Sequence, residues 1–191
     1  GKAANSSISL KQIHVTDNFW NKYVHLVKDV IIPYQWDILN DKLEDVETSH
    51  CIENFKIAAG EKEGEFQGAV FQDTDVAKWL EAVGFVLNYE RDEKLEELAD
   101  ETIELIGRAQ QPDGYLNTYF TIKEPDGRWS NLMEGHELYT AGHMIEAAVA
   151  YYEATGKRRF LEIVSKFADL VCQTFGSEEG KIHGYPGHQE I

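Results

Sequence analysis

Apolar residues recur every three or four positions along most of the chain, which is the spacing of helices with one buried side. In the segment 74–89, for example, Val76, Leu80 and Val83 fall on one side of a helix. The same spacing recurs in several other segments. We therefore expect helices over residues 19–39, 52–59, 74–89, 93–109, 137–155 and 159–175.

Proline and glycine divide these helical segments. Pro33 predicts a kink or a break in the first helix, because proline has no N–H and its ring crowds the preceding turn. Gly156 and Gly176 are typical of residues that end a helix. Residues 110–135 are rich in Gly, Pro, Asp and Asn and predict a long loop, in which residues 114–121 predict a small pair of strands.

The chain also contains an internal repeat. A displacement of 65 positions places residues 79–82 on residues 144–147, and each copy reads as a helix, a short turn, a second helix and a Gly-rich segment. Such αα-hairpins stack into an open solenoid or close into a ring. About three hairpins fit in this chain. The expected fold is therefore all-α: a single domain over residues 17–191 that forms about half of an (α/α)6 toroid, with short β excursions in loops and an N-terminal arm over residues 1–16.

Charge limits the classes of partner. The formal net charge is −16, from 34 acidic and 18 basic side chains, which argues against binding to nucleic acid or to an anionic membrane surface. No stretch approaches the length of about 18 apolar residues that a membrane span needs, and no signal peptide is recognisable. The sequence is compatible with the cytoplasm, the periplasm and the cell exterior as the compartment of this protein.

The two cysteines show no metal motif. Cys51 and Cys172 are far apart and form no CxxC pair, so no thiolate metal site is expected in this chain. Cys172 lies in an apolar helical pattern and is expected in the core. A disulfide between the two stays open.

Polar clusters precede the predicted inner helices of the repeats. The first contains Asp73 and Asp75, the second His136 and Glu137, and the third is the segment 185–190. Because the inner helices of successive hairpins run in the same direction, all three clusters should meet on one rim. Helix N-termini also collect there and present N–H groups to anionic or hydroxyl-rich ligands. The repeat therefore predicts a binding pocket on this rim.

Histidines are the leading candidates for that pocket. His136 and His188 occupy matched positions, and a neutral imidazole both donates and accepts hydrogen bonds in one plane, as a pair of sugar hydroxyls requires. The alternative is that each histidine caps a helix or packs in the core. His143, seven positions after His136, either shares its face or has a packing role. The spacing of His136, Glu137 and His143 does not match a zinc HExxH motif.

Carboxylates and a loop supply further candidates. Asp73 and Asp75 are either a pair for acid–base catalysis or helix N-caps. Asn117 and Tyr119 are polar and aromatic residues on a long loop, and such loops tend to be functional. Trp129 is assigned to the same wall of the predicted pocket as these loop residues.

Several long and irregular stretches together resemble glycoside hydrolase family 127, the β-L-arabinofuranosidases. The resemblance covers most of the chain and is carried by DNFW (17–20), FQDTDVAKWLEA (71–82), DGYLNTYF (113–120), HELYTAGH (136–143) and PGHQE (186–190). It implies an (α/α)6 catalytic domain followed by β-rich domains. It also implies retaining hydrolysis of a terminal arabinofuranosyl unit by a zinc-bound cysteine, with a Glu as acid/base. Histidines in motifs like those of His136 and His188 are expected to contact the sugar.

The family's cysteines, its zinc-ligand Glu and its acid/base Glu lie beyond the point where this chain stops. We therefore expect no catalytic residue and no metal ligand here, with zinc belonging only to the full-length enzyme. The expected ligand is an arabinose-containing oligosaccharide or glycan, and self-association through the open edge of the toroid is expected. Two other hypotheses stay open: a toroid glycosidase that uses Asp73, Asp75 or Asp113, and a non-catalytic helical-repeat binding module. The predicted sugar-binding residues are His136, His188, Asp75, Asn117, Tyr119 and His143.

Overall fold

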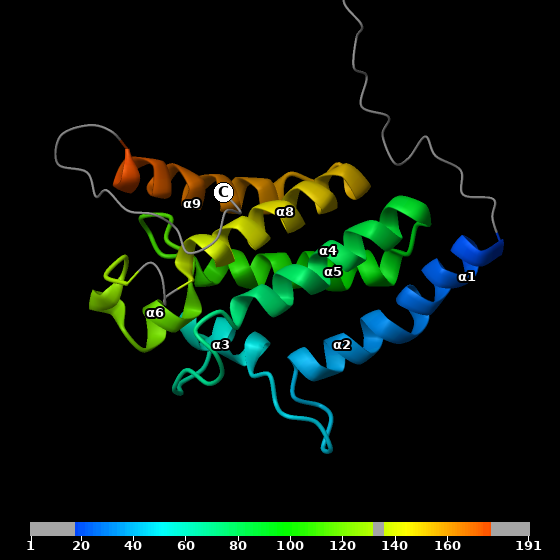
Figure 1. Cartoon of the computed structure of the whole chain (residues 1–191), viewed down its shortest axis with the longest axis horizontal. Helices are drawn as coiled ribbons and strands as arrows, with labels where there is room; N and C mark the ends of the chain where they lie inside the picture. The colour runs from blue at the N-terminus through cyan, green and yellow to red at the C-terminus, as the bar shows by residue number, and fades with distance from the viewer. Residues whose placement is uncertain (1–17, 132–135, 177–191) are drawn as a thin grey trace, which may run out of the picture.

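The computed structural model describes residues 18–131 and 136–176 of the chain, and within them helices account for nearly all regular structure (Figure 1). No strand occurs in these residues, so the prediction of an all-α fold is confirmed. The long helices begin and end within two residues of the predicted limits. The elements are α1 (Asn18–Leu26), the π-helix η2 (Val27–Ile31), α2 (Ile32–Leu39), α3 (Cys51–Ala58), α4 (Asp73–Tyr89), α5 (Glu93–Ala109), α6 (Thr118–Ile122), the 3-10 helix η3 (Pro125–Gly127), α8 (Glu137–Thr155) and α9 (Arg159–Phe175).

The predicted strand pair over residues 114–121 is wrong, because α6 begins inside this segment. The Asn117 side chain accepts a hydrogen bond from the backbone N–H of Phe120 at 3.1 Å and so caps the helix. Upstream, Asp113 accepts a bond from the N–H of Tyr115 at 3.1 Å and closes a turn. These local side-chain bonds to the backbone outweigh the strand propensity of the aromatic residues.

The first helix continues through Pro33 without a break. Its irregularity is the π turn η2, after which Pro33 lies in the first turn of α2. The N–H of Ile32 bonds to the carbonyl of Val27, five residues back. A π turn widens the helix locally, and this gives the proline ring room that a regular α-helix lacks.

Two complete hairpins, α4–α5 and α8–α9, form the repeat. The rings of Phe71 and His136 lie 5.4 Å apart at the start of the two inner helices, and Gly84 faces the backbone of Ala150 further along. Both pairs have a displacement of 65 or 66 positions. Helices α4 and α8 therefore run parallel, in the register that the sequence repeat predicts.

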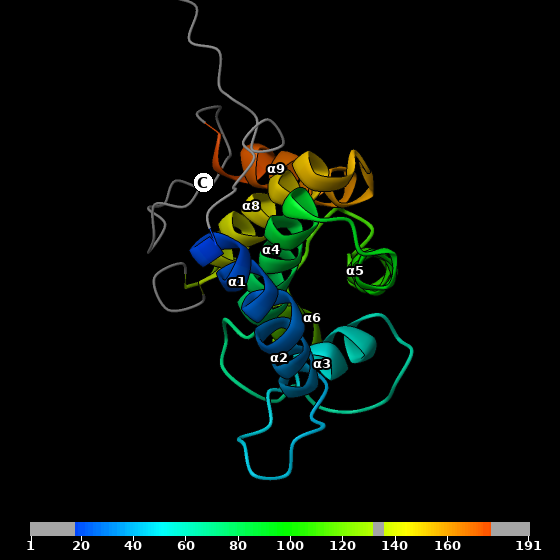
Figure 2. The ribbon, with the colours of Figure 1, turned by 90° about the vertical axis from the view of Figure 1, so that its right-hand side faces the viewer.

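The long helix α1–η2–α2 runs antiparallel to α4. The indole of Trp79 donates to the carbonyl of Ile32 at 3.1 Å, and the hydroxyl of Tyr89 donates to Asn21 at 2.7 Å. In the end-on view of Figure 2, α5 lies on one side of α4 and α1–α2 on the other. Helix α4 is thus enclosed, and ten of its seventeen residues are buried. This arrangement is that of part of an α/α toroid.

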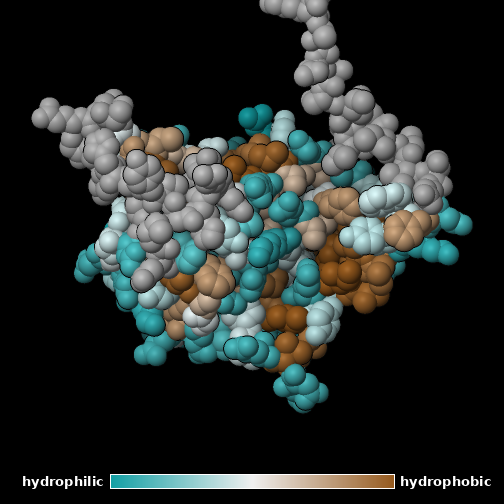
Figure 3. All heavy atoms as spheres, in the orientation of Figure 1, coloured by the Kyte–Doolittle hydropathy of each residue, from teal (hydrophilic) through white to brown (hydrophobic). Residues whose placement is uncertain are grey.

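An apolar stripe remains exposed along α1–η2–α2. Its members recur at intervals of three or four residues, and each is between 44% and 68% exposed. Figure 3 shows hydrophobic atoms gathered around this part of the surface. The stripe consists of Phe19, Tyr23, Leu26, Val30 and Tyr34.

The close contact of Gly84 with α8 allows a test of this packing. A Cβ added at Gly84 would lie 3.1 Å from the carbonyl carbon of Ala150 and 3.2 Å from the N of Tyr151, both backbone atoms. We expect Gly84→Ala to lower the free energy of unfolding by about 1–2 kcal/mol, because the cost of overpacking exceeds the gain in helix propensity. Urea denaturation measures the change.

Gly107 of α5 is the matched control. Its added Cβ would meet only the ends of the Arg159 and Ile163 side chains, which can move. Gly107→Ala should therefore leave stability unchanged or raise it slightly. Equal losses for the two variants would contradict the assignment of a special close contact to Gly84.

Candidate functional site

A row of rings runs from the start of α4 along the first turns of α8. Neighbouring ring centroids lie 5.4 Å apart between Phe71 and His136, 5.9 Å between His136 and Tyr139, and 4.6 Å between Tyr139 and His143. All three contacts are edge-to-face. The structure thus links His136 and His143 through successive ring contacts, and we call this set the ring row: Phe71, His136, Tyr139 and His143.

His136 holds a special backbone position. It directly precedes α8 with φ of +51°, in the left-handed region, and its side chain makes no capping hydrogen bond to the helix. The interpretation of His136 as a side-chain cap is therefore wrong. Its half-buried ring is turned to Phe71 and Tyr139 instead.

Asp75 lies in the first turn of α4 and is half-buried. Its carboxylate accepts a bond from the Gln72 amide at 2.9 Å, and the same amide nitrogen donates to the Ser49 hydroxyl at 3.1 Å. Burial raises the pKa of Asp75, while the nearby Lys78 ammonium and a hydrogen bond from Ser49 oppose that rise. Asp75 and Lys78 also line a cavity of about 150 Å³ between α2 and α4, together with Gln35, Ile38, Leu39 and Trp79.

Asp73 has a different role from Asp75. Its buried carboxylate accepts bonds from the backbone N–H of Thr118, at 2.8 Å, and from the Thr118 hydroxyl. Burial raises its pKa to about 6, against the lowering effect of these two bonds. The residue at the cap position is Gln72, whose side chain accepts no capping hydrogen bond from the helix backbone, so the N-cap interpretation of Asp73 and Asp75 is wrong. Asp73 anchors the following loop.

Glu137 repeats this role at the start of α8. It is fully buried and accepts bonds from the Tyr115 hydroxyl and, at 3.0 Å, from the N–H of Trp129. Burial raises its pKa, while those bonds and the Arg128 guanidinium lower it. Asp73 and Glu137 are each the first residue of an inner helix. Together they hold the segment 110–131 against the rim, a function that the sequence pattern did not indicate: the displacement of 65 positions places Asp73 on Leu138, one position after Glu137.

The loop residues Asn117 and Tyr119 are placed by this anchoring. Asn117 is buried, and its oxygen caps α6 while its Nδ2 has no hydrogen-bond partner. Tyr119 is half-buried: its hydroxyl donates to Glu124 at 3.2 Å, and its ring lies 5.1 Å from that of Phe66. Sugar contacts by these two residues stay predictions. His188 lies outside the described residues.

Two other candidates have structural roles. Asp113, besides its turn, pairs with Arg128 at 2.7 Å. The ring of Trp129 packs among those of Tyr115, Phe167 and Phe175 at the edge of the core, and its assignment to the wall of the pocket stays a prediction.

Neither cysteine fits a zinc–thiolate centre. Cys51 is buried, donates to the carbonyl of Gln72 at 3.3 Å, and has a pKa well above its ordinary value because of burial and the nearby Asp73 and Asp75 carboxylates. Cys172 is exposed on α9, so its expected place in the core is wrong; its position faces outward although its neighbours Val171 and Phe167 are buried. Both thiols are free.

Comparisons with known proteins identify the class to which this fold and rim belong. The profile of the β-L-arabinofuranosidase GH127 catalytic domain matches residues 12–191. The chain therefore belongs to glycoside hydrolase family 127. No helix among the described residues is long and apolar enough to cross a bilayer.

Individual relatives agree with this assignment. The non-reducing end β-L-arabinofuranosidase of Bifidobacterium longum subsp. longum is 44% identical over an alignment 195 residues long, which covers 94% of this chain and 30% of that protein. A crystal structure of a GH127 β-L-arabinofuranosidase from Geobacillus stearothermophilus T6 is 64% identical, with a TM-score of 0.91 over 93% of this chain and 28% of that one. A second GH127 β-arabinofuranosidase structure is 36% identical, with a TM-score of 0.85 over 95% and 29%. The chain thus spans less than a third of the length of these relatives.

The raised pKa of Asp73 predicts a pH dependence of stability. As pH rises from about 4, the unfolded Asp ionises first, while the folded carboxyl keeps its proton up to about pH 6. The folded state binds more protons in this window, so this group's contribution to the free energy of unfolding falls by roughly 2–3 kcal/mol between pH 4 and 6.5. Urea denaturation at a series of pH values measures it.

Asp73→Asn removes this titration while its amide can still bond to Thr118. The stability of the wild type relative to Asp73→Asn should therefore decrease across the window. In Thr118→Val, loss of the hydroxyl bond should carry the decrease to higher pH. Parallel curves for the wild type and Asp73→Asn would show that burial does not shift this carboxyl.

Proposed function

We propose that this chain forms the N-terminal part of the catalytic domain of a retaining β-L-arabinofuranosidase. In this proposal it contributes one wall of the sugar-binding site, and the ring row with Asp75 is that wall. The observation that carries the proposal is the ring row, since imidazole edges beside aromatic rings suit the hydroxyls and apolar faces of a furanose. The activity of the Bifidobacterium relative supplies the class of substrate, an arabinofuranoside at a non-reducing end.

The chemical step is assigned to residues outside this chain. The family resemblance implies a zinc-bound cysteine as nucleophile, and the buried, protonated thiol of Cys51 and the solitary Cys172 supply no such group. The carboxylate of Asp73 is hydrogen-bonded to Thr118, and that of Asp113 forms an ion pair with Arg128. We therefore propose that the chain binds part of the substrate and does not hydrolyse it alone.

A chimera tests this function. The chain replaces the aligned 30% of the Bifidobacterium enzyme, and hydrolysis of p-nitrophenyl β-L-arabinofuranoside is followed. We expect the chimera to be active and the 191-residue chain alone to be inactive. His136→Ala in the chimera should lower kcat/KM by about 10-fold or more, as expected when a sugar hydroxyl loses its partner. The matched control is His25→Ala, whose exposed ring pairs with Glu90 far from the ring row.

The result for Asp75 separates two mechanisms. If Asp75 only binds sugar, Asp75→Asn in the chimera should raise KM more than it lowers kcat. A fall of kcat by ~10² or more would favour instead a carboxylate that takes part in proton transfer. Turnover by the isolated chain would overturn the proposal that it does not hydrolyse the substrate alone. An unchanged kcat/KM in His136→Ala would overturn the proposed role of the ring row.

We also propose that the isolated chain self-associates through the apolar stripe on α1–η2–α2. Burial of these five side chains is favourable, and the stripe has no cover among the described residues. Light scattering should show species larger than a monomer, and Val30→Glu with Leu26→Glu should restore the monomer. A monomeric wild type at high concentration would refute the proposal.

A further inference from the structure

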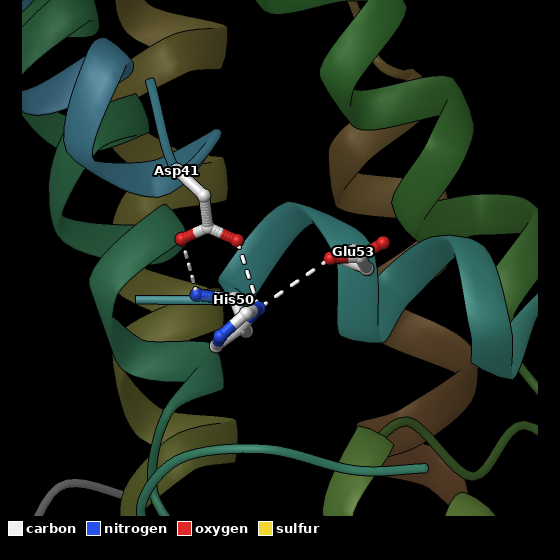
Figure 4. Close-up of side chains that lie close together, drawn as sticks. All are labelled: Asp41, His50 and Glu53. Atoms are coloured by element: carbon white, nitrogen blue, oxygen red, sulfur yellow. Dashed lines mark hydrogen bonds and ion pairs between the residues drawn. The ribbon is translucent and has the colours of Figure 1, made fainter. Parts of the chain in front are cut away.

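A cluster of three metal-ligating side chains lies between α2 and α3, outside the ring row. Asp41 follows α2, His50 directly precedes α3, and Glu53 lies in the first turn of α3. Their donor atoms, Asp41 Oδ2, His50 Nδ1 and Glu53 Oε2, all lie within 4.8 Å of one another. Figure 4 shows both carboxylates directed at the same ring nitrogen.

We propose that Asp41, His50 and Glu53 bind a divalent first-row transition-metal ion, with zinc as the leading candidate.

The two carboxylates converge on a single ring nitrogen. Nδ1 of His50 lies 2.8 Å from Asp41 Oδ2 and 3.4 Å from Glu53 Oε2. A bare lone pair there would face two anionic oxygens, so this arrangement requires a proton or a cation between them. One N–H bonds well to only one of the two oxygens, whereas a metal ion serves all three donors.

The donor spacing suits a small tetrahedral ion. Zinc bonds of about 2.0–2.2 Å place neighbouring donors about 3.4 Å apart. The separation of 3.4 Å between His50 Nδ1 and Glu53 Oε2 already has this value, and the 2.8 Å between His50 Nδ1 and Asp41 Oδ2 would have to widen by about 0.6 Å. One imidazole and two carboxylates favour zinc and its neighbours over magnesium and calcium, which prefer oxygen donors alone.

The surroundings leave the donor atoms available. The other oxygen of Asp41 accepts a bond from the backbone N–H of His50 at 2.9 Å, which orients the carboxylate and leaves Oδ2 for a ligand. The hydroxyl of Thr48 lies 2.9 Å from His50 Nε2 and can accept its proton, which makes Nδ1 the free lone pair. Histidine ligands of metals are commonly oriented by such a bond. Lys62 contacts the other oxygen of Glu53, Oε1. Its ammonium therefore offsets part of the negative charge of this carboxylate but leaves Oε2 available to a metal ion.

The cluster connects to the candidate sugar site. Ser49, beside His50, accepts a bond from the Gln72 amide that also holds Asp75. A metal ion bound to Asp41, His50 and Glu53 would link the end of α2 to α3. It would thereby restrict the motion of Ser49, which helps to position Asp75 through Gln72.

Calorimetry with zinc tests the site on the whole chain after chelator treatment. We expect saturable binding of one ion, weakened by at least about 10-fold in Glu53→Gln, since even supporting residues of metal sites are worth that much. His50→Asn should weaken it similarly, and Asn tolerates the φ of +55° at this position. His25→Gln, the matched control, should bind as the wild type does.

Melting temperatures show whether each variant is folded. Glu53 is partly exposed, so Glu53→Gln should keep the fold and its binding result decides the question. Binding that is unchanged in both Glu53→Gln and His50→Asn would overturn the proposal. So would a thiolate-to-cobalt absorption band on titration with cobalt, because it would place the ion on a cysteine. These measurements need no hydrolytic activity, so they stand apart from the proposed function.

Discussion

The parallel packing of α4 against α8 is the contact on which the rest of the structure depends. Their backbones approach closely because residue 84 is glycine, and this approach sets the register of the repeat. Since both helices run in the same direction, their first turns meet at one end of the molecule. Phe71, Asp75 and His136 therefore lie on a common rim although up to 65 positions separate them in the chain.

The buried carboxylates of Asp73 and Glu137 fix the loop that lies against this rim. A buried charge is costly unless hydrogen bonds satisfy it, and each first-turn carboxylate receives at least two: Asp73 from Thr118, and Glu137 from Tyr115 and Trp129. Both also lie at a helix N-terminus, where the dipole favours negative charge. These hydrogen bonds of Asp73 and Glu137 determine the position of the loop that contains Asn117 and Tyr119.

The connection between α2 and α3 has a similar polar organisation on a smaller scale. Asp41 and His50 both have positive φ values, and the carboxylate of Asp41 holds the backbone and ring of His50 together. Ser49 joins this connection to Gln72 and Asp75. The rim is thus supported from two directions, by segment 110–131 and by the segment before α3.

Sequence periodicity by itself determined the six long helical segments and the repeat, because a buried helix face must recur every three or four residues. It also indicated the rim and His136, since the repeat aligned the polar turns. It missed α6, the π turn before Pro33 and the outward position of Cys172, each decided by local bonds or neighbouring helices. Only the tertiary structure separated Asp73 from Asp75, two positions apart: one turns into the core toward Thr118 and the other to the cavity beside α2, because distant segments supply their partners.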